Sequence, residues 1–431
     1  MKIKTNLNIK IIVWLVVILT IFFGMPNLTS AEQLLHSQTL DQNSLNQLNY
    51  LTADGGKIVI RLNPATFTQN QLAEIKIIDE GRTEFSGYRR ITDIYRFSFS
   101  GMGEWPKRPI IILLPHQDEI ATPKFIGLWN SGTQKWQKMD SINLTNRRAA
   151  RLSTMLPFAT IAVFEKINND DFTFNAAASA PSISAKAGIV IEERTKTVLF
   201  EKESGKSLAQ ASLTKLATAR NFLKHKSNLS ELVSYSYLDN IGGATVPFIN
   251  NDRLLMRDLF FASLVASANN ATRSLERLSG LSDANYLAEL NNHAKYLGLT
   301  ETVFRDITGL NPGNQTTALE MAVLASDSLK PLAMLQATTT HQYAARGHST
   351  GRIYAFSNTN EILNSPHYYI TGSKTGYLPD GSYGGDGYNL MMRVRYQTGK
   401  EIIGVVLGSP TRDQSYQDVQ NILNYSLNGL K

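Results

Sequence analysis

The chain has 431 residues, which is too many for one ordinary domain and enough for two. Hydrophobic residues make up 42% of it and charged residues 18%, so its composition excludes a disordered chain and predicts sizeable cores. Its 43 Lys and Arg exceed its 36 Asp and Glu by +7 without any run of basic residues, which argues against nucleic acid as a partner.

The first 31 residues have the pattern of a targeting segment. Three lysines precede an apolar stretch at 11–23, and small residues at 29–31 offer a cleavage site. The apolar stretch is shorter than the roughly 20 residues of a spanning helix, which favours a cleaved signal peptide over a membrane anchor. In both cases we expect an exported protein, in the periplasm or at the extracytoplasmic surface. An uncleaved segment would also tether it to the membrane.

Residues 32–165 predict a β-sandwich-like domain, because apolar runs of strand length alternate with turn residues. These runs fall at 57–62, 75–78, 95–99, 109–114 and 159–164. Trp129 and Trp136 flank a predicted hairpin turn at 130–132, so we expect the two indoles to pack across the strands, with sugar binding as the alternative. No motif indicates the role of this domain.

The segment 166–186 contains little to bury, which predicts a linker. The remaining residues, 187–431, predict a second domain of the α/β (α+β) class. Its expected elements are strands at 188–191 and 197–200, a helix at about 212–224, a largely helical stretch at about 226–345, strands at 370–377, 389–396 and 401–407, and a closing helix. Strands at both ends of this domain predict one sheet built from two distant halves, with a helical insertion between them.

Ser212 and Lys215 form the sharpest chemical signal. Side chains three apart on a helix share a face, so the amine could take the hydroxyl proton. A lysine is a base only when neutral, which requires burial and a neighbouring positive charge to lower its pKa. The spacing alone is weak evidence, because a helix-capping serine followed by an exposed lysine gives the same pattern.

Two further elements make the pattern specific. Ser267-Ala268-Asn269 interrupts an apolar helical stretch, and Lys374-Thr375-Gly376 lies on the first closing strand. The lysine and threonine offer a cation and a hydroxyl to a carboxylate, and the glycine lets a substrate backbone approach closely. In this order, with each in its expected element, the three elements are strongly specific.

Together, these three sequence elements resemble those of the penicillin-recognising serine hydrolases, and most closely those of the low-molecular-mass D-alanyl-D-alanine carboxypeptidases. The resemblance runs from residue 185 to about 425. It implies a β-lactamase/DD-peptidase-like antiparallel sheet flanked by helices, with an all-helical insertion. It also implies removal of the terminal D-alanine from peptidoglycan stem peptides, covalent inhibition by β-lactam antibiotics, and no cofactor.

The resemblance also implies the catalytic roles. Ser212 would attack the carbonyl between the last two D-alanines, and Lys215 would be the base. Ser267 would relay a proton toward the leaving amine, and Asn269 would bind the backbone amide of the substrate.

The substrate-binding roles follow in the same way. Lys374 and Thr375 would hold the terminal carboxylate, with Lys374 also helping to keep Lys215 neutral, and Gly376 would admit the substrate backbone. The backbone amides of Ser212 and Tyr377 would form the oxyanion hole.

The chain departs from the family pattern at Thr359, where members often carry an arginine, so some affinity for carboxylates is expected to be missing. A histidine common after the Gly-Leu pair is also absent from 309–314. A DD-endopeptidase that cuts cross-links remains the alternative, because it uses the same residues on a longer substrate and motifs do not encode the pocket shape that sets specificity.

Two other functions fit less well. A class A β-lactamase needs Glu-x-x-Leu-Asn, and the nearest sequence, at 289–291, has the wrong spacing. A non-enzymatic surface binding module is disfavoured because every nominated reactive residue is present. We expect no metal site, because the chain has no cysteine and no His-Glu-x-x-His motif.

Overall fold

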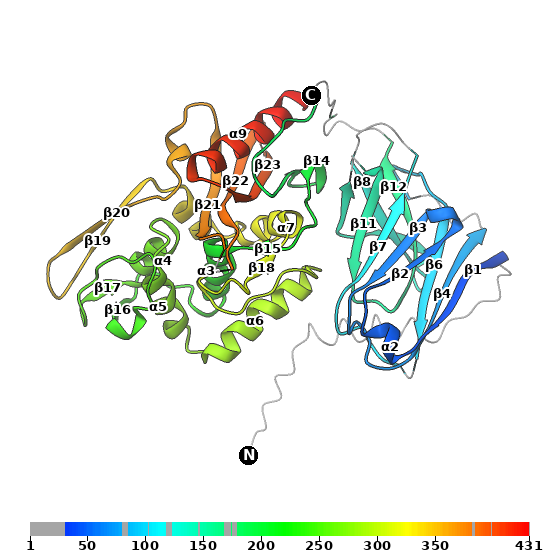
Figure 1. The fold of residues 1–431 in the computed structure, drawn as a ribbon, viewed down its shortest axis with the longest axis horizontal. Coiled ribbons are helices and arrows are strands. Elements are labelled where there is room, and N and C mark those ends of the chain that lie inside the picture. Colours follow the sequence, from blue (N-terminus) through cyan, green and yellow to red (C-terminus); the bar gives the residue numbers. More distant parts are fainter. Residues whose placement is uncertain are drawn as a thin grey trace, which may run out of the picture. The chain divides into compact units, whose positions relative to one another are not determined.

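The computed structural model describes residues 31–79, 85–101, 103–117, 123–144, 147–167, 174, 179–381, 384–397 and 399–430. The predicted targeting segment lies outside them, except for Ala31. In the described ranges, no helix is both long and apolar enough to cross a membrane. The chain divides into two compact units, the first within 1–143 and 148–170, the second within 144–147 and 171–431 (Figure 1).

The first unit is built from antiparallel strands in two sheets. One sheet has the order β1 (Ala31–Leu40), β4 (Gln71–Asp79), β6 (Ile94–Ser100), β12 (Phe158–Lys166), β8 (Lys124–Asn130) and β9 (Lys135–Lys138), with β5 (Tyr88–Arg90) beside β12. The other contains β2 (Asn49–Ala53), β3 (Ile58–Leu62), β7 (Ile110–Pro115) and β11 (Ala149–Thr154) in that order. One hydrophobic core includes Ile60 and Ile112 from one sheet and Ile75 and Phe97 from the other. The predicted β-sandwich-like domain is therefore confirmed.

The tryptophan pair packs across a hairpin, as predicted. Trp129 and Trp136 are opposite each other on β8 and β9, with ring centroids 5.4 Å apart in an edge-to-face arrangement. Asn130 shapes the turn, since its Oδ1 accepts hydrogen bonds from the amides of Gly132 and Thr133 at 3.0 Å. Because Trp136 is buried, one of the two indoles is not available to a sugar.

The sheet of the second unit joins strands from its two ends. Its order is β14 (Thr197–Lys202), β13 (Ala187–Glu192), β23 (Lys400–Ser409), β22 (Gly387–Gln397) and β21 (Tyr369–Leu378), all antiparallel. The pairing of β13 with β23 links the two halves, and Ala187 is opposite Leu407 there. This confirms the sheet that the sequence predicted.

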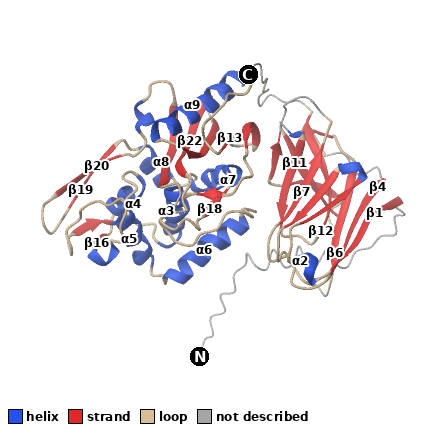
Figure 2. Ribbon diagram, in the orientation of Figure 1, coloured by secondary structure: helices blue, strands red, loops and turns tan. Residues whose placement is uncertain are grey.

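Helices flank this sheet (Figures 1 and 2). Helix α9 (Arg412–Gly429) packs on β22 and β23, and its Val419 and Leu423 lie against Gly404. The other helices lie between the two halves of the sheet in sequence: α3 (Thr214–His225), α4 (Met256–Leu264), α5 (Asn269–Ser279), α6 (Asp283–Tyr296), α7 (Ala318–Ser328) and α8 (Leu332–Thr339). The helical insertion is confirmed.

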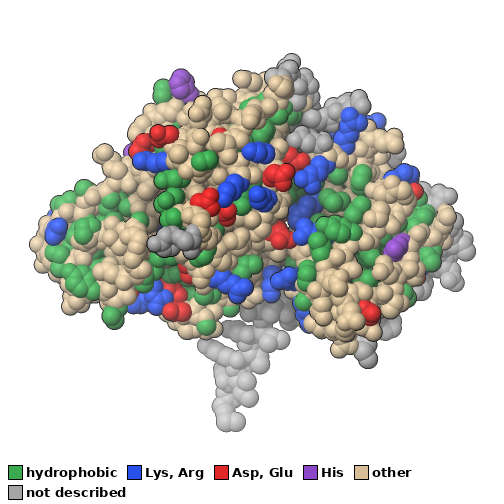
Figure 3. Space-filling model, in the orientation of Figure 1, with side chains coloured by type: hydrophobic (Ala, Val, Ile, Leu, Met, Phe, Trp, Pro, Cys, Tyr) green, Lys and Arg blue, Asp and Glu red, His purple; other side chains and the backbone are tan. Residues whose placement is uncertain are grey.

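Three short antiparallel pairs accompany these helices. They are β15 (Leu208–Ala209) with β18 (Gln315–Thr316), β16 (Leu232–Ser234) with β17 (Arg253–Leu255), and β19 (Gln342–Arg346) with β20 (Ile353–Ser357). On the face of this unit that Figure 3 presents, Lys and Arg side chains are interspersed with Asp and Glu.

The end of the predicted linker packs into the second unit. Ile183 and Ala185 are buried. Asp418 on α9 accepts hydrogen bonds of 2.8 Å from the amide and hydroxyl of Ser184 and from the amide of Ala185. Most of the segment before residue 179 lies outside the described residues. The sequence pattern did not reveal this clasp, because isolated apolar residues in a polar stretch give no periodic signal.

Candidate active site

Ser212 lies in a single 3-10 turn, η3 (Ala211–Leu213), which continues directly into α3 at Thr214. Side chains three apart are nearly eclipsed in a 3-10 turn. Nζ of Lys215 accordingly lies 2.8 Å from Oγ of Ser212. Lys215 is fully buried, which excludes the alternative of a capping serine with an exposed lysine.

The environment of Lys215 favours the neutral amine. Its Nζ also donates to the carbonyl of Thr308 at 2.8 Å. Burial, and after it the nearby charge of Lys374, hold the pKa of Lys215 well below its ordinary value, while Asp306 opposes this shift. Both conditions that the sequence analysis required of a lysine base are therefore present.

Close backbone contacts hold the turn that carries Ser212. Ala211 has a φ of 48°, in the left-handed region that residues with a Cβ seldom enter. Gly309 has a φ of +87°, and a Cβ on it would lie 1.8 Å from the carbonyl oxygen of Ala211. A Cβ on Gly376 would lie 3.1 Å from the carbonyl oxygen of Gln210. Glycine at 309 and 376 therefore lets a loop and β21 pack against this turn.

Ser267 and Lys374 form a second serine and lysine pair. Ser267 lies between α4 and α5 with a φ of 55°, and its hydroxyl accepts a hydrogen bond of 2.9 Å from Nζ of Lys374. Nζ of Lys374 also donates to the carbonyl of Thr375 at 2.9 Å. Lys374 is buried, and this burial lowers its pKa to about 7.

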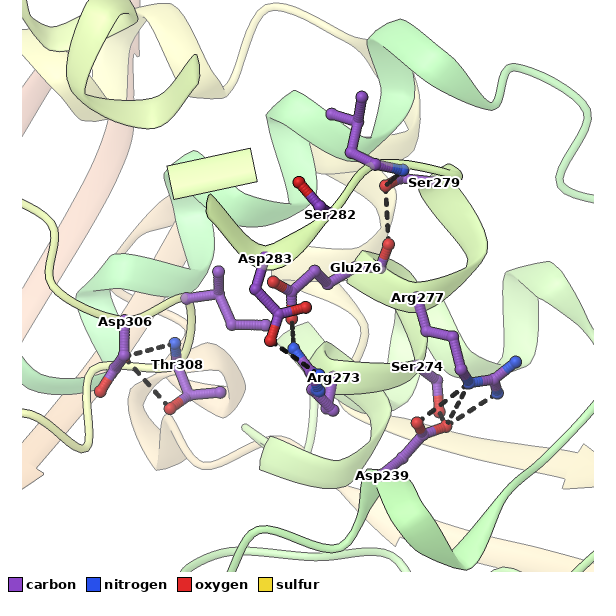
Figure 4. Close-up of polar contacts among 12 residues, drawn as sticks. Asp239, Arg273, Ser274, Glu276, Arg277, Ser279, Ser282, Asp283, Asp306 and Thr308 are labelled. Carbon is purple, nitrogen blue, oxygen red and sulfur yellow. Dashed lines mark hydrogen bonds and ion pairs between the residues drawn. The ribbon is translucent and has the colours of Figure 1, made fainter. Parts of the chain in front are cut away.

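Asn269 is the first residue of α5 and anchors one wall of the site. Its Nδ2 donates to the carbonyl of Gly242 at 2.9 Å, and its backbone amide donates to the carbonyl of Ala244 at 2.6 Å. Its Oδ1 has no hydrogen-bond partner among the residues that the structure describes. The same wall is held further along, where Arg277 and Ser274 of α5 both point to Asp239 (Figure 4). The Ser274 hydroxyl donates to Asp239 at 2.6 Å.

A loop at 305–314 supplies the carbonyl that Lys215 contacts. Its Asp306 carboxylate accepts a hydrogen bond of 2.7 Å from the amide of Thr308 (Figure 4). It also accepts one of 2.5 Å from the amide of Gly309. Asn314 ties the loop to α3, because its Nδ2 donates to Thr214 Oγ1 at 3.0 Å. Asp306 and Thr308 were not predicted from the sequence. The available signal was an Asp two residues before a Thr and three before a Gly, which is typical of an Asx turn.

A cavity of about 510 Å³ lies over these groups. Six of the predicted site residues line it: Ser212, Ser267, Asn269, Thr375, Gly376 and Tyr377. The other two, Lys215 and Lys374, are buried and reach the lining serines through their amines. The structure therefore brings all eight predicted residues together.

Two further residues, Thr359 and Arg412, line the same cavity. Thr359 and Thr375 share a hydrogen bond of 2.5 Å between their hydroxyls. Arg412, the first residue of α9, was not predicted from the sequence. No motif marks Arg412, because only the packing of α9 on the sheet brings it to the site.

Within the described parts of the chain, no group of three or more His, Asp or Glu side chains could hold a metal ion.

A family model described as D-alanyl-D-alanine carboxypeptidase matches residues 174–411. The chain is 27% identical over 250 residues to D-alanyl-D-alanine carboxypeptidase DacF of Bacillus subtilis, covering 56% of this chain and 62% of that one. It is 29% identical over 234 residues to a D-alanyl-D-alanine endopeptidase of Haemophilus influenzae, covering 52% of this chain and 76% of that one. The match thus spans less than two thirds of the length of the Bacillus protein.

The fold is also similar to solved structures. The Streptomyces K15 DD-transpeptidase matches with a TM-score of 0.51 and 25% identity, over 58% of this chain and 100% of that one. Penicillin binding protein 6B of Escherichia coli matches in fold with a TM-score of 0.51, over 58% of this chain and 80% of that one.

Proposed function

The chain belongs to the D-alanyl-D-alanine carboxypeptidase family, and from this premise we propose that it removes the terminal D-alanine from peptidoglycan stem peptides. One observation supports this proposal most: a buried lysine amine of lowered pKa lies 2.8 Å from a serine hydroxyl at the wall of a cavity. A neutral amine at this distance can accept the hydroxyl proton and activate the serine.

Acylation begins when Oγ of Ser212 attacks the carbonyl carbon between the last two D-alanines. Lys215 takes the hydroxyl proton, and the backbone amides of Ser212 and Tyr377 donate to the oxyanion that forms. The carbon–nitrogen bond then breaks, and the proton passes through Ser267 to the departing amine. Free D-alanine leaves, and the shortened peptide remains as an ester on Ser212.

Deacylation uses the same groups with water in place of the departing amine. Lys215 takes a proton from the water, whose oxygen attacks the ester carbonyl. The ester bond breaks, and the proton returns to Oγ of Ser212. The products are the shortened peptide and the free serine, so the cycle needs no cofactor.

Substrate binding divides between two ends of the cavity. Asn269 binds the peptide backbone through its amide side chain, and Gly376 admits that backbone close to β21. Lys374 and Thr375 hold the terminal carboxylate at the other end. Arg412 adds a second cation there, which offsets the absence of an arginine at Thr359.

We propose the same site for β-lactam antibiotics, which would acylate Ser212. Because peptidoglycan stem peptides are its proposed substrate, we propose a location outside the cytoplasm, with residues 1–31 as export signal or tether. Intact-protein mass spectrometry after incubation with a labelled penicillin tests the nucleophile. The wild type and a Ser207→Ala control, which removes an exposed serine, should each gain one adduct. Ser212→Ala should gain none, and equal labelling of this variant would contradict the assignment.

The endopeptidase alternative is supported by the Haemophilus influenzae relative. An endopeptidase must accommodate a second peptide strand where a carboxypeptidase binds a free carboxylate. The protein is therefore incubated separately with a pentapeptide precursor and with cross-linked dimeric muropeptide. We expect D-alanine from the pentapeptide; cleavage of the dimer without it would favour the endopeptidase.

A further inference from the structure

The cation Arg412 at the carboxylate end of the cavity already has an acidic neighbour. Its Nη2 forms an ion pair with Oε1 of Glu361, the first residue of η5 (Glu361–Asn364). The side chain of Arg412 is 48% exposed and that of Glu361 is 65% exposed. Glu361 is not among the residues that line the cavity. It therefore approaches Arg412 from outside the cavity wall.

Arg412 is connected to the predicted carboxylate site by a chain of polar contacts. Its Nε donates to the hydroxyl of Tyr416 at 3.1 Å, and that hydroxyl donates to the carbonyl of Thr359 at 2.9 Å. Thr359 in turn shares the 2.5 Å hydrogen bond with Thr375. The ring of Tyr416 also lies beneath the guanidinium, 5.6 Å from its carbon. These contacts connect Arg412 to Thr375 through Tyr416 and Thr359.

A guanidinium binds a carboxylate most strongly through two parallel N–H groups. In Arg412, Nε is engaged by Tyr416 and Nη2 by Glu361. Among the residues that the structure describes, Nη1 has no partner. A ligand carboxylate would therefore meet a guanidinium with two of its three nitrogens already engaged. Its positive charge would also be partly neutralised by Glu361.

We propose that Glu361 is a specificity-determining residue, which competes with the ligand carboxylate for Arg412 and lowers the affinity of the cavity for ligands that end in a carboxylate. This inference rests on the proposed function. The pair is exposed to solvent, so its effect is modest, about two- to fivefold in affinity. Salt screens exposed charges, so the effect should shrink as ionic strength rises.

The test compares the second-order rate of acylation by benzylpenicillin, which carries a carboxylate, with that by its uncharged methyl ester. Glu361→Gln should react about two- to fivefold faster than wild type with the free acid and at the wild-type rate with the ester. Asp413→Asn is the matched control, because it removes the same charge one residue beyond Arg412 from an exposed position. Its rates should equal those of the wild type.

A double variant tests whether Glu361 acts through Arg412. In an Arg412→Gln background, Glu361→Gln should give no gain with the free acid, because the contested cation is gone. Unfolding temperatures of all variants show whether each one folds.

An unchanged or slower rate of Glu361→Gln with the free acid would overturn the competition, the slower rate indicating that Glu361 instead orients Arg412. An equal gain with the ester would overturn it as well. A wild-type protein that penicillin does not acylate would overturn the proposed function and this inference together. A normally acylated wild type without the expected gain would overturn this inference alone.

Discussion

Asp306 and Lys215 are joined through the backbone of one residue, Thr308. The carboxylate of Asp306 accepts from the Thr308 amide at 2.7 Å, and the Thr308 carbonyl accepts from Nζ of Lys215 at 2.8 Å. The negative charge of Asp306 also raises the pKa of Lys215 against the stronger effect of burial. Asp306 therefore acts on the base through its position and through its charge.

Replacing Asp306 with Asn should separate these two effects. The change removes the charge, so the pKa of Lys215 should fall further and the acidic limb of the acylation rate should move to lower pH. The amide side chain can accept at only one atom, so the free energy of unfolding should fall by about 1–3 kcal/mol. The pH dependence of penicillin acylation measures the position of the acidic limb, and denaturant unfolding measures the change in the free energy of unfolding. Asp283→Asn, which removes the charge of an exposed acid, is the control. If the acidic limb of Asp306→Asn stays in place or moves to higher pH, the charge effect is contradicted.

Lys215→Arg should lose acylation by about 100-fold or more, because a guanidinium keeps its proton and cannot serve as the base. In the wild type, the rate should rise as pH rises through the lowered pKa of Lys215. Stopped-flow acylation at several pH values measures both. Lys224→Arg on the same helix should react normally, and a Lys215→Arg protein with near-normal rates would show that another group takes the proton.

Lys374 should give the pH profile a falling limb. Its pKa is lowered to about 7 by burial, so the free protein loses this positive charge as pH rises through that value. Ligands with a carboxylate should then bind more weakly above that pH, whereas the methyl ester of benzylpenicillin should show no such fall. Lys374→Ala should also lose much of the rate with the free acid. A profile that stays flat over about two pH units above the pKa of Lys374 with the free acid would count against this role.

The boundary between the units remains a prediction that limited proteolysis can test. Cleavage should occur first within 166–182 and release a folded C-terminal fragment that still reacts with penicillin. The clasp of Asp418 on Ser184 and Ala185 should protect the residues after this point. First cuts within 226–345, or an inactive fragment, would contradict the boundary. Mass spectrometry of the fragments locates the cuts.

The sequence predicted the parts of the site whose geometry is set by residues close together in the chain. The spacing of Ser212 and Lys215 is a property of one helical turn, and the alternating residues around Lys374 mark a strand. The family resemblance that these residues carried is confirmed by the match over 174–411. The strands with regular apolar runs were predictable for the same reason, whereas β1, β2 and β11 were not predicted.

The remaining features depend on contacts between distant segments. The left-handed conformations of Ala211 and Ser267 have no sequence signal, because the packing around them, and not their residue type, imposes them. Arg412 reaches the cavity only because α9 packs on the sheet. Its pairing with Glu361 spans 51 residues and follows no periodicity.

The main part of the second unit, 171–431, closes on itself, since its two ends meet. Phe174 forms a β-bridge with Leu430, and its ring lies 6.1 Å from that of Tyr425. A chain that enters and leaves a unit at one place can be joined there and opened elsewhere with little change to the core. A circular permutant that connects residue 430 to 174 and begins in the turn between β19 and β20 should therefore keep the cavity intact. The same closure makes this unit a module that can be fused to other domains at one edge.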